Sequence, residues 1–120
     1  MSYVSSDYKD YVDTVVGDGQ CVAYVRKAAS APATAQWSEG TKVKGQSGLA
    51  PGTAIATFQN GHYTNSTNGD SHAAIYESQD SKGLWVYDQW TGHPVSKRQI
   101  RFKGGVGTPN NDGDAFSVIE

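Results

Sequence analysis

The sequence predicts an α+β fold, with N-terminal helices packed on a small antiparallel β-sheet. In the first third of the chain, apolar side chains recur at helical spacing. From Thr53 onward the pattern changes to short runs of β-branched and aromatic residues, which are typical of strands. The 14 glycines recur between these runs and indicate short elements joined by turns. A chain of 120 residues is expected to form one domain, residues 1–120.

Two helices are expected near the N-terminus. The segment Tyr8–Val16 carries its apolar residues on one side, and Asp7 is placed to cap it. After a glycine-rich break, a second helix is expected from about Gln20 to Ser30. It should stop before Pro32, because the residue that precedes a proline avoids helical angles. One further turn is expected over Thr34–Ser38.

The rest of the chain predicts strands separated by polar loops. Residues 41–50, 60–71 and 104–114 are polar and rich in glycine or asparagine, and they are expected to be loops. Helices followed by strands in this order predict an antiparallel meander. The expected strands are Thr53–Phe58, His72–Glu77, Leu84–Trp90, Arg98–Phe102 and Ala115–Ile119.

Composition excludes several classes of function. Ten basic and twelve acidic residues are interspersed without a basic run, so neither nucleic acid nor an anionic membrane is an expected partner. No apolar stretch is long enough for membrane insertion. A single cysteine excludes an internal disulfide and a thiolate pair for zinc.

The first residues carry no basic segment followed by an apolar one, so no secretory signal is expected. Either the protein acts in the cytoplasm, or it leaves by a route that needs no cleaved leader, or a leader is missing from this chain.

The single cysteine is Cys21, and it lies where a nucleophile would be placed. It follows the glycines of Gly17–Gly19 and opens the second predicted helix. Glycines there allow a sharp turn and leave the first helical N–H groups free. A thiol at that end of a helix feels the positive end of the helix dipole, which favours the thiolate. A lone cysteine is also commonly a small core residue, and position alone does not decide.

A thiolate nucleophile needs a base, and the histidines are the candidates. His62 and His93 lie in polar stretches and are interpreted as surface residues. His72 differs, because it begins a strand directly after a loop and apolar residues follow it. We expect it at the rim of a cleft, as a base; the alternative is a half-buried structural histidine.

The base needs an orienting partner, and strand register suggests Asp88. If the turn between the two strands is centred near Asp80, the numbers of opposed residues sum to 160, and His72 opposes Asp88. A slip of one residue would send Asp88 to the other face of the sheet. The alternative for Asp88 is a strand-end residue that accepts a nearby backbone N–H. The expected oxyanion donor is first the backbone N–H of Cys21, and the Gln20 side chain is a weaker candidate.

This pattern resembles the papain-like NlpC and CHAP amidase superfamily. In those enzymes a cysteine opens a helix, a histidine starts the second strand of a small antiparallel sheet, and a third polar residue lies on the next strand. The resemblance implies a papain-like fold in which Cys21 is the nucleophile, His72 the general base and Asp88 the orienting residue, with no cofactor and no metal. The resembling segments are Gly19–Val25, Pro51–Phe58, His72–Tyr76 and Val86–Trp90.

Small size and the lack of a leader further resemble the type VI secretion amidase effectors, toxins that cleave the peptide stems of peptidoglycan. The resemblance implies acyl transfer at the D-Glu–diaminopimelate bond or at the diaminopimelate–D-Ala cross-link. It also implies a cognate immunity protein, which would cover the Cys21 cleft. The protein would be a monomer, made in the bacterial cytoplasm, exported without a signal peptide, and active in the target-cell periplasm.

Other functions stay open at this point. A cysteine acyltransferase would use the same nucleophile and base but pass the acyl group to an amine. A metal site built from the histidines and Asp70 has no supporting ligand spacing. A non-catalytic wall-binding module would use an aromatic platform of Trp37, Trp85, Tyr87 and Trp90, although aromatic residues at strand spacing are more often core.

Overall fold

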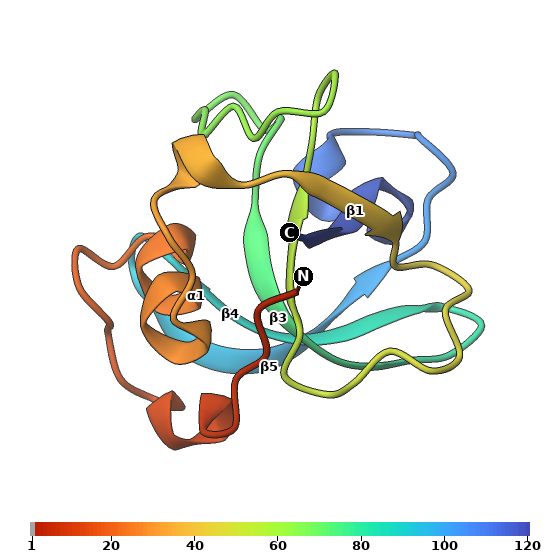
Figure 1. The fold of residues 1–120 in the computed structure, drawn as a ribbon. Helices are drawn as coiled ribbons and strands as arrows, with labels where there is room; N and C mark the ends of the chain where they lie inside the picture. The colour runs from red at the N-terminus through yellow and green to blue at the C-terminus, as the bar shows by residue number, and fades with distance from the viewer. Residues whose placement is uncertain (1) are drawn as a thin grey trace.

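The structure is a computed structural model that describes residues 2–120 (Figure 1). Within that range, none of the helices has the length and apolar character needed to cross a bilayer. In chain order the elements are the 3-10 turn Tyr8–Tyr11, helix α1 Cys21–Ala29, the 3-10 turn Thr34–Gln36, strands β1 Glu39–Lys42, β2 Ala54–Thr57, β3 Ala73–Gln79, β4 Gly83–Trp90 and β5 His93–Arg101, the 3-10 turns Pro109–Asn111 and Gly113–Ala115, and strand β6 Phe116–Ile119.

The strands in residues 2–120 form one antiparallel sheet in the order β1-β6-β2-β3-β4-β5. The predicted α+β fold with an antiparallel sheet is therefore confirmed, and each predicted strand has its counterpart. Two differences concern edge strands. β5 begins at His93 rather than Arg98, and β1, which was not predicted, extends into the segment 41–50 that was predicted to be a loop. Polar edge strands such as β1 lack the hydrophobic alternation that identifies a strand in a sequence.

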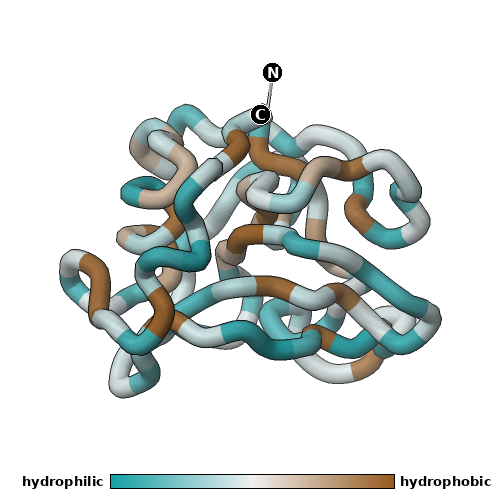
Figure 2. The backbone as a smooth tube through the Cα atoms, turned by 90° about the horizontal axis from the view of Figure 1, so that it is seen from below, coloured by the Kyte–Doolittle hydropathy of each residue, from teal (hydrophilic) through white to brown (hydrophobic). Residues whose placement is uncertain are grey.

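Both faces of the sheet are covered, which accounts for the continuous burial of β2 and β6. On one face α1 packs through Tyr24 and Val25 against β3 and β4, where Ile75 is fully buried. The opposite face buries a second cluster that includes Val43 and Phe116. Figure 1 shows α1 beside β3 and β4, and Figure 2 shows hydrophobic positions interspersed with hydrophilic ones along the backbone.

The predicted helix over Tyr8–Val16 is wrong. Only Tyr8–Tyr11 forms a short 3-10 turn, and the Asp7 side chain does not cap it. Beyond that turn the backbone pairs with β5 instead. The N–H of Asp13 donates to the carbonyl of Val95 at 2.8 Å, and the N–H of Val95 donates to the carbonyl of Thr14 at 3.0 Å. Long-range pairing thus replaces the helical hydrogen bonds, and Asp13 adopts a left-handed conformation that a helix interior excludes.

The predicted register between β3 and β4 is also wrong, by two residues. Ile75 opposes Tyr87, so opposed numbers sum to 162 rather than 160 over this part of the ladder. The turn is displaced because the Asp80 carboxylate accepts the N–H groups of Lys82 and Gly83, which starts the turn at Asp80 instead of centring it there.

A β-bulge in β3 nevertheless places His72 and Asp88 on the same face of the sheet. Next to the turn, Gln79 opposes Leu84, which gives an odd sum of 163, and the register shifts between Tyr76 and Ser78. The extra residue is Glu77. An odd sum would place His72 and Asp88 on opposite faces of the sheet, whereas the even sum beyond the bulge places them on the same face.

Candidate active site

Helix α1 presents Cys21 at its first position. The residues before it adopt left-handed angles, at φ +57° for Gly17 and +86° for Gly19, which glycine tolerates best. The Cys21 side chain is half-buried. Its Sγ lies 3.7 Å from the hydroxyl of Tyr63, and the backbone N–H of Ala73 also faces the sulfur. The lone cysteine therefore lies at the start of a helix, among polar groups.

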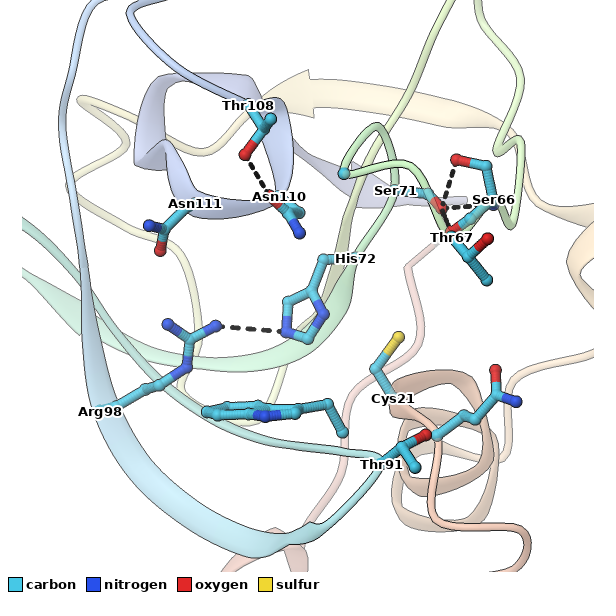
Figure 3. Close-up of a pocket in the computed structure, with 13 residues that line it drawn as sticks. Cys21, Ser66, Thr67, Ser71, His72, Thr91, Arg98, Thr108, Asn110 and Asn111 are labelled. Carbon is cyan, nitrogen blue, oxygen red and sulfur yellow. Dashed lines mark hydrogen bonds between the residues drawn. The ribbon is translucent and has the colours of Figure 1, made fainter.

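His72 directly precedes β3, and neighbouring strands hold it in place. Its N–H donates to Thr57 Oγ1 at 3.0 Å, and its carbonyl accepts the N–H of Thr57 at 3.0 Å. The imidazole is almost fully buried. Its Nε2 lies 2.7 Å from Oδ2 of Asp88, which leaves Nδ1 as the ring nitrogen for the Cys21 thiol. Figure 3 shows the Cys21 side chain and this ring next to each other at the cavity.

Asp88 is completely buried on β4, and besides His72 it pairs with Arg98. The Nε of Arg98 donates to Oδ1 at 3.1 Å and to Oδ2 at 2.9 Å, and Nη2 lies 2.8 Å from Oδ2. Arg98 in turn lies over the ring of Trp90, 4.9 Å from its centroid. A buried carboxylate needs such a counter-charge, because removing an ion from water without one is costly.

The charges of the three groups reinforce one another. Burial raises the pKa of the Cys21 thiol, but the hydrogen bond and charge of His72 outweigh burial and bring that pKa below its ordinary value. Burial likewise lowers the pKa of His72, yet the bonds to Asp88 and Cys21 raise it to about 9. The pKa of Asp88 is lowered against its burial by His72 and Arg98. At neutral pH the arrangement favours a thiolate beside an imidazolium.

The sulfur and the imidazole open into a cavity of about 500 Å³. Its walls come from the start of α1, the loop before β3, the end of β4, β5 and the loop before β6 (Figure 3). Two of these loops touch, since the N–H of Asn110 donates to the carbonyl of Gly69 at 3.0 Å. The lining is largely polar and includes Ser66, Thr67, Trp90, Thr108, Asn110 and Asn111.

The structure thus brings together all three residues that the sequence singled out. Gln20, the weaker oxyanion candidate, is exposed and lines the cavity. His62 is exposed and His93 half-buried. Among residues 2–120, no three metal-ligating side chains are grouped to hold an ion. The aromatic platform does not form, because Trp37 and Tyr87 are buried in the core.

Sequence reasoning missed Arg98 and Tyr63. A signal for Arg98 existed: a buried aspartate requires a cation, and Arg98 lies on the next strand with the parity that puts it on the same face. Tyr63 follows His62 in a polar loop, and nothing in the local pattern distinguishes it. Its position depends on packing against Trp37, at a ring separation of 4.8 Å.

The sequence and the fold resemble those of known proteins. The sequence model of the family described as Domesticated amidase effector 2 matches residues 2–119. A protein of that name from Ixodes scapularis is 45% identical over 107 residues, covering 84% of this chain and 70% of the relative. A Type VI secretion amidase effector 2 protein from Salmonella typhi is 35% identical over all of both chains.

A solved structure, Type 6 secretion amidase effector 2 (Tae2), superposes with a TM-score of 0.84 at 34% identity, covering 98% of this chain and 94% of that one. The match to the family model over nearly the whole sequence, together with these relatives, shows that the chain belongs to the Domesticated amidase effector 2 family.

Proposed function

We propose that this protein is a cysteine-dependent amidase of bacterial peptidoglycan, built as one papain-like domain of the NlpC/CHAP type over residues 1–120. The observation that carries the proposal is the line from Cys21 through His72 to Asp88 at the base of an open polar cavity. The names of the relatives support amide hydrolysis as the reaction.

The reaction is acyl transfer in two halves. The Cys21 thiolate attacks the carbonyl carbon of a stem-peptide amide, and the carbonyl oxygen becomes negative. The imidazolium of His72 gives its Nδ1 proton to the leaving nitrogen, so the C–N bond breaks and a thioester remains on Cys21. Neutral His72 then takes a proton from water as the water attacks the thioester. A carboxylic acid leaves, and the thiolate–imidazolium pair is restored.

Asp88 and Arg98 support the reaction without contacting the substrate. Asp88 holds the tautomer of His72 and stabilises its positive charge. Arg98 keeps Asp88 ionised. The substrate is a stem peptide cut at the D-Glu–diaminopimelate bond or at the diaminopimelate–D-Ala cross-link. The hydroxyl and amide side chains of the cavity suit the polar backbone of such a peptide.

The biological setting follows from the effector relatives. We propose an antibacterial role, with export by a type VI secretion system and action in the periplasm of the target cell. A cognate immunity protein would protect the producing cell by covering the cavity above Cys21. The amidase itself would act as a monomer, since the proposed catalytic residues all belong to one chain.

Digestion of Gram-negative sacculi tests the proposal. Wild type and Cys21→Ala are incubated with purified sacculi, and the soluble fragments are identified by mass spectrometry. New stem-peptide fragments from the wild type alone support the amidase, and their masses name the bond. An added amine that appears in the products would indicate an acyltransferase. Intact sacculi that retain bound, folded wild type would indicate a binding module.

A further inference from the structure

Gln89 is a fully buried polar side chain that the reaction above does not use. It follows Asp88 on β4, so it projects from the opposite face of the sheet, the face that α1 covers. Its Oε1 accepts the N–H of Val16 at 2.9 Å. Its Nε2 donates to the carbonyl of Val16 at 2.8 Å and to the carbonyl of Gln20 at 2.8 Å. One side chain thus ties the segment before α1 to the sheet at three points.

The bond to the Gln20 carbonyl has a consequence for Cys21. That carbonyl and the Cys21 N–H are opposite ends of one planar trans peptide, so they point in opposite directions. The carbonyl accepts the Gln89 Nε2–H at 2.8 Å and the N–H of Ala23 at 3.2 Å, so the Cys21 N–H is directed away from both donors. The hydrogen bonds within residues 2–120 include none donated by this N–H, and both Gln20 and Cys21 line the cavity.

The Cys21 sulfur is held by different contacts. His72, the backbone N–H of Ala73 and the Tyr63 hydroxyl all face it, and none of them belongs to the segment that Gln89 ties down. The direction of the N–H and the place of the sulfur therefore depend on separate groups. A change at Gln89 should therefore affect the direction of the Cys21 N–H more than the position of the Cys21 sulfur.

We propose that Gln89 is a positioning residue for oxyanion stabilisation: it orients the Gln20–Cys21 peptide so that the Cys21 N–H faces the carbonyl oxygen of the substrate. Two consecutive residues of β4 then position both halves of the site. Asp88 orients the imidazole on one face, and Gln89 orients the oxyanion donor on the other. This inference rests on the proposed role of Cys21.

The chain offers a matched control in Gln79. Its Oε1 accepts the N–H of Gly45 at 2.9 Å, and its Nε2 donates to the carbonyls of Val43 and Gln46 at 2.9 and 3.2 Å. Gln79, which is half-buried, thus ties down a loop through the same three kinds of bond and also donates to the Tyr76 hydroxyl at 3.2 Å, and none of these residues lines the cavity of Cys21. Replacing either glutamine with methionine keeps the length of the side chain and removes all of these hydrogen bonds.

The experiment compares Gln89→Met with Gln79→Met at a temperature well below the Tm of each. The substrate is cross-linked muropeptides released from Gram-negative sacculi by a muramidase. For Gln89→Met we expect kcat to fall about 10- to 100-fold with KM within about 3-fold, because the oxyanion exists only after attack. Iodoacetamide alkylates Cys21 without forming an oxyanion. The rate of this alkylation in Gln89→Met should therefore stay within about 3-fold of the wild-type rate. For Gln79→Met, kcat should stay within about 3-fold of wild type.

Two outcomes overturn the inference: a fall in kcat no larger than that of Gln79→Met, or equal falls in amide cleavage and in alkylation. If Gln89→Met does not fold, Gln89→Leu replaces it, since it also removes all three hydrogen bonds without burying a charge, and the same criteria apply. Failure of the proposed function would give a different result from failure of this inference. It would appear as a wild type that cleaves nothing, or as a Cys21→Ala variant that still cleaves.

Discussion

His72 Nε2 lies 2.7 Å from Asp88 Oδ2, although the two residues do not oppose each other directly in the sheet. They lie on the same face of adjacent strands and meet diagonally, and both are buried. This contact decides which imidazole nitrogen is available. With Nε2 occupied by the carboxylate, Nδ1 is left, in the proposed reaction, to exchange its proton with Cys21 and with the leaving amine.

Asp88→Asn tests that contact. The amide keeps the shape of the side chain but carries no charge, so it cannot raise the pKa of His72 as the carboxylate does. We expect kcat/KM on muropeptides to fall by about 10²- to 10⁴-fold. The pKa of His72, followed by NMR of the imidazole, should drop below about 9. A variant with nearly full activity and an unchanged His72 titration would refute the orienting role.

Arg98→Met removes the cation that is paired with Asp88 while keeping much of the apolar stem. Because the arginine head is partly exposed, we expect a modest loss of unfolding free energy, about 1–3 kcal/mol, and a decrease in kcat of about 10-fold. Arg98→Lys should recover part of both. The control is Arg101→Met, an exposed arginine at the end of the same strand. Equal effects from the two methionine variants would show that the ion pair contributes nothing specific.

Deletion of Glu77 tests the bulge. Without Glu77, Tyr76 and Ser78 become neighbours that still oppose Val86 and Trp85, so the ladder becomes regular and His72 stays on the same face as Asp88. We expect a folded variant, by circular dichroism, with kcat/KM within about 10-fold of wild type. Glu77→Ala keeps the bulge and removes only surface ion pairs to Lys9 and Lys97, so it should retain activity within about 3-fold. A loss of kcat/KM larger than about 10²-fold would contradict this account of the register and would mean that the bulge itself is needed for activity.

The same bulge shows how far sequence reasoning reaches in this fold. The helix that starts at Cys21 and the strand that follows His72 could be predicted, because glycine punctuation and apolar spacing are local signals. The shared face of His72 and Asp88 was inferred from a turn centre that is wrong by one and a half residues. The inference survived because a bulged residue, which leaves no mark in the pattern, restored the parity.

Long-range contacts account for the other differences. The segment after Tyr11 has helical spacing but pairs with Val95, so tertiary hydrogen bonds override local preference. Gln89 looks like any strand residue until its partners, about 70 positions earlier in the chain, are known. A buried glutamine or aspartate in a strand is a signal that a partner exists, but it does not say which residue the partner is.

The pH dependence of cleavage follows from the paired charges. In the proposed reaction, the productive form carries a thiolate at Cys21 and an imidazolium at His72. Its activity should therefore decline as pH rises through about 9, where His72 loses its proton. On the acid side activity should persist below the ordinary titration range of a thiol, because the pKa of Cys21 is lowered. Initial rates on muropeptides from pH 5 to 10 check both limbs of this profile.

In His72→Ala, alkylation of Cys21 should require higher pH than in wild type. The same alkylation profile in both proteins would contradict the pairing.

Reversible blocking of Cys21 tests the central claim most directly, since it is the only cysteine in the chain. Methyl methanethiosulfonate adds a small S-methyl group to the thiol, intact mass gives the fraction modified, and dithiothreitol removes the group. Nucleophilic catalysis by Cys21 predicts that the fraction of muropeptide cleavage lost equals the fraction modified, and that activity returns with the free thiol. Full cleavage by completely methylthiolated protein would contradict it.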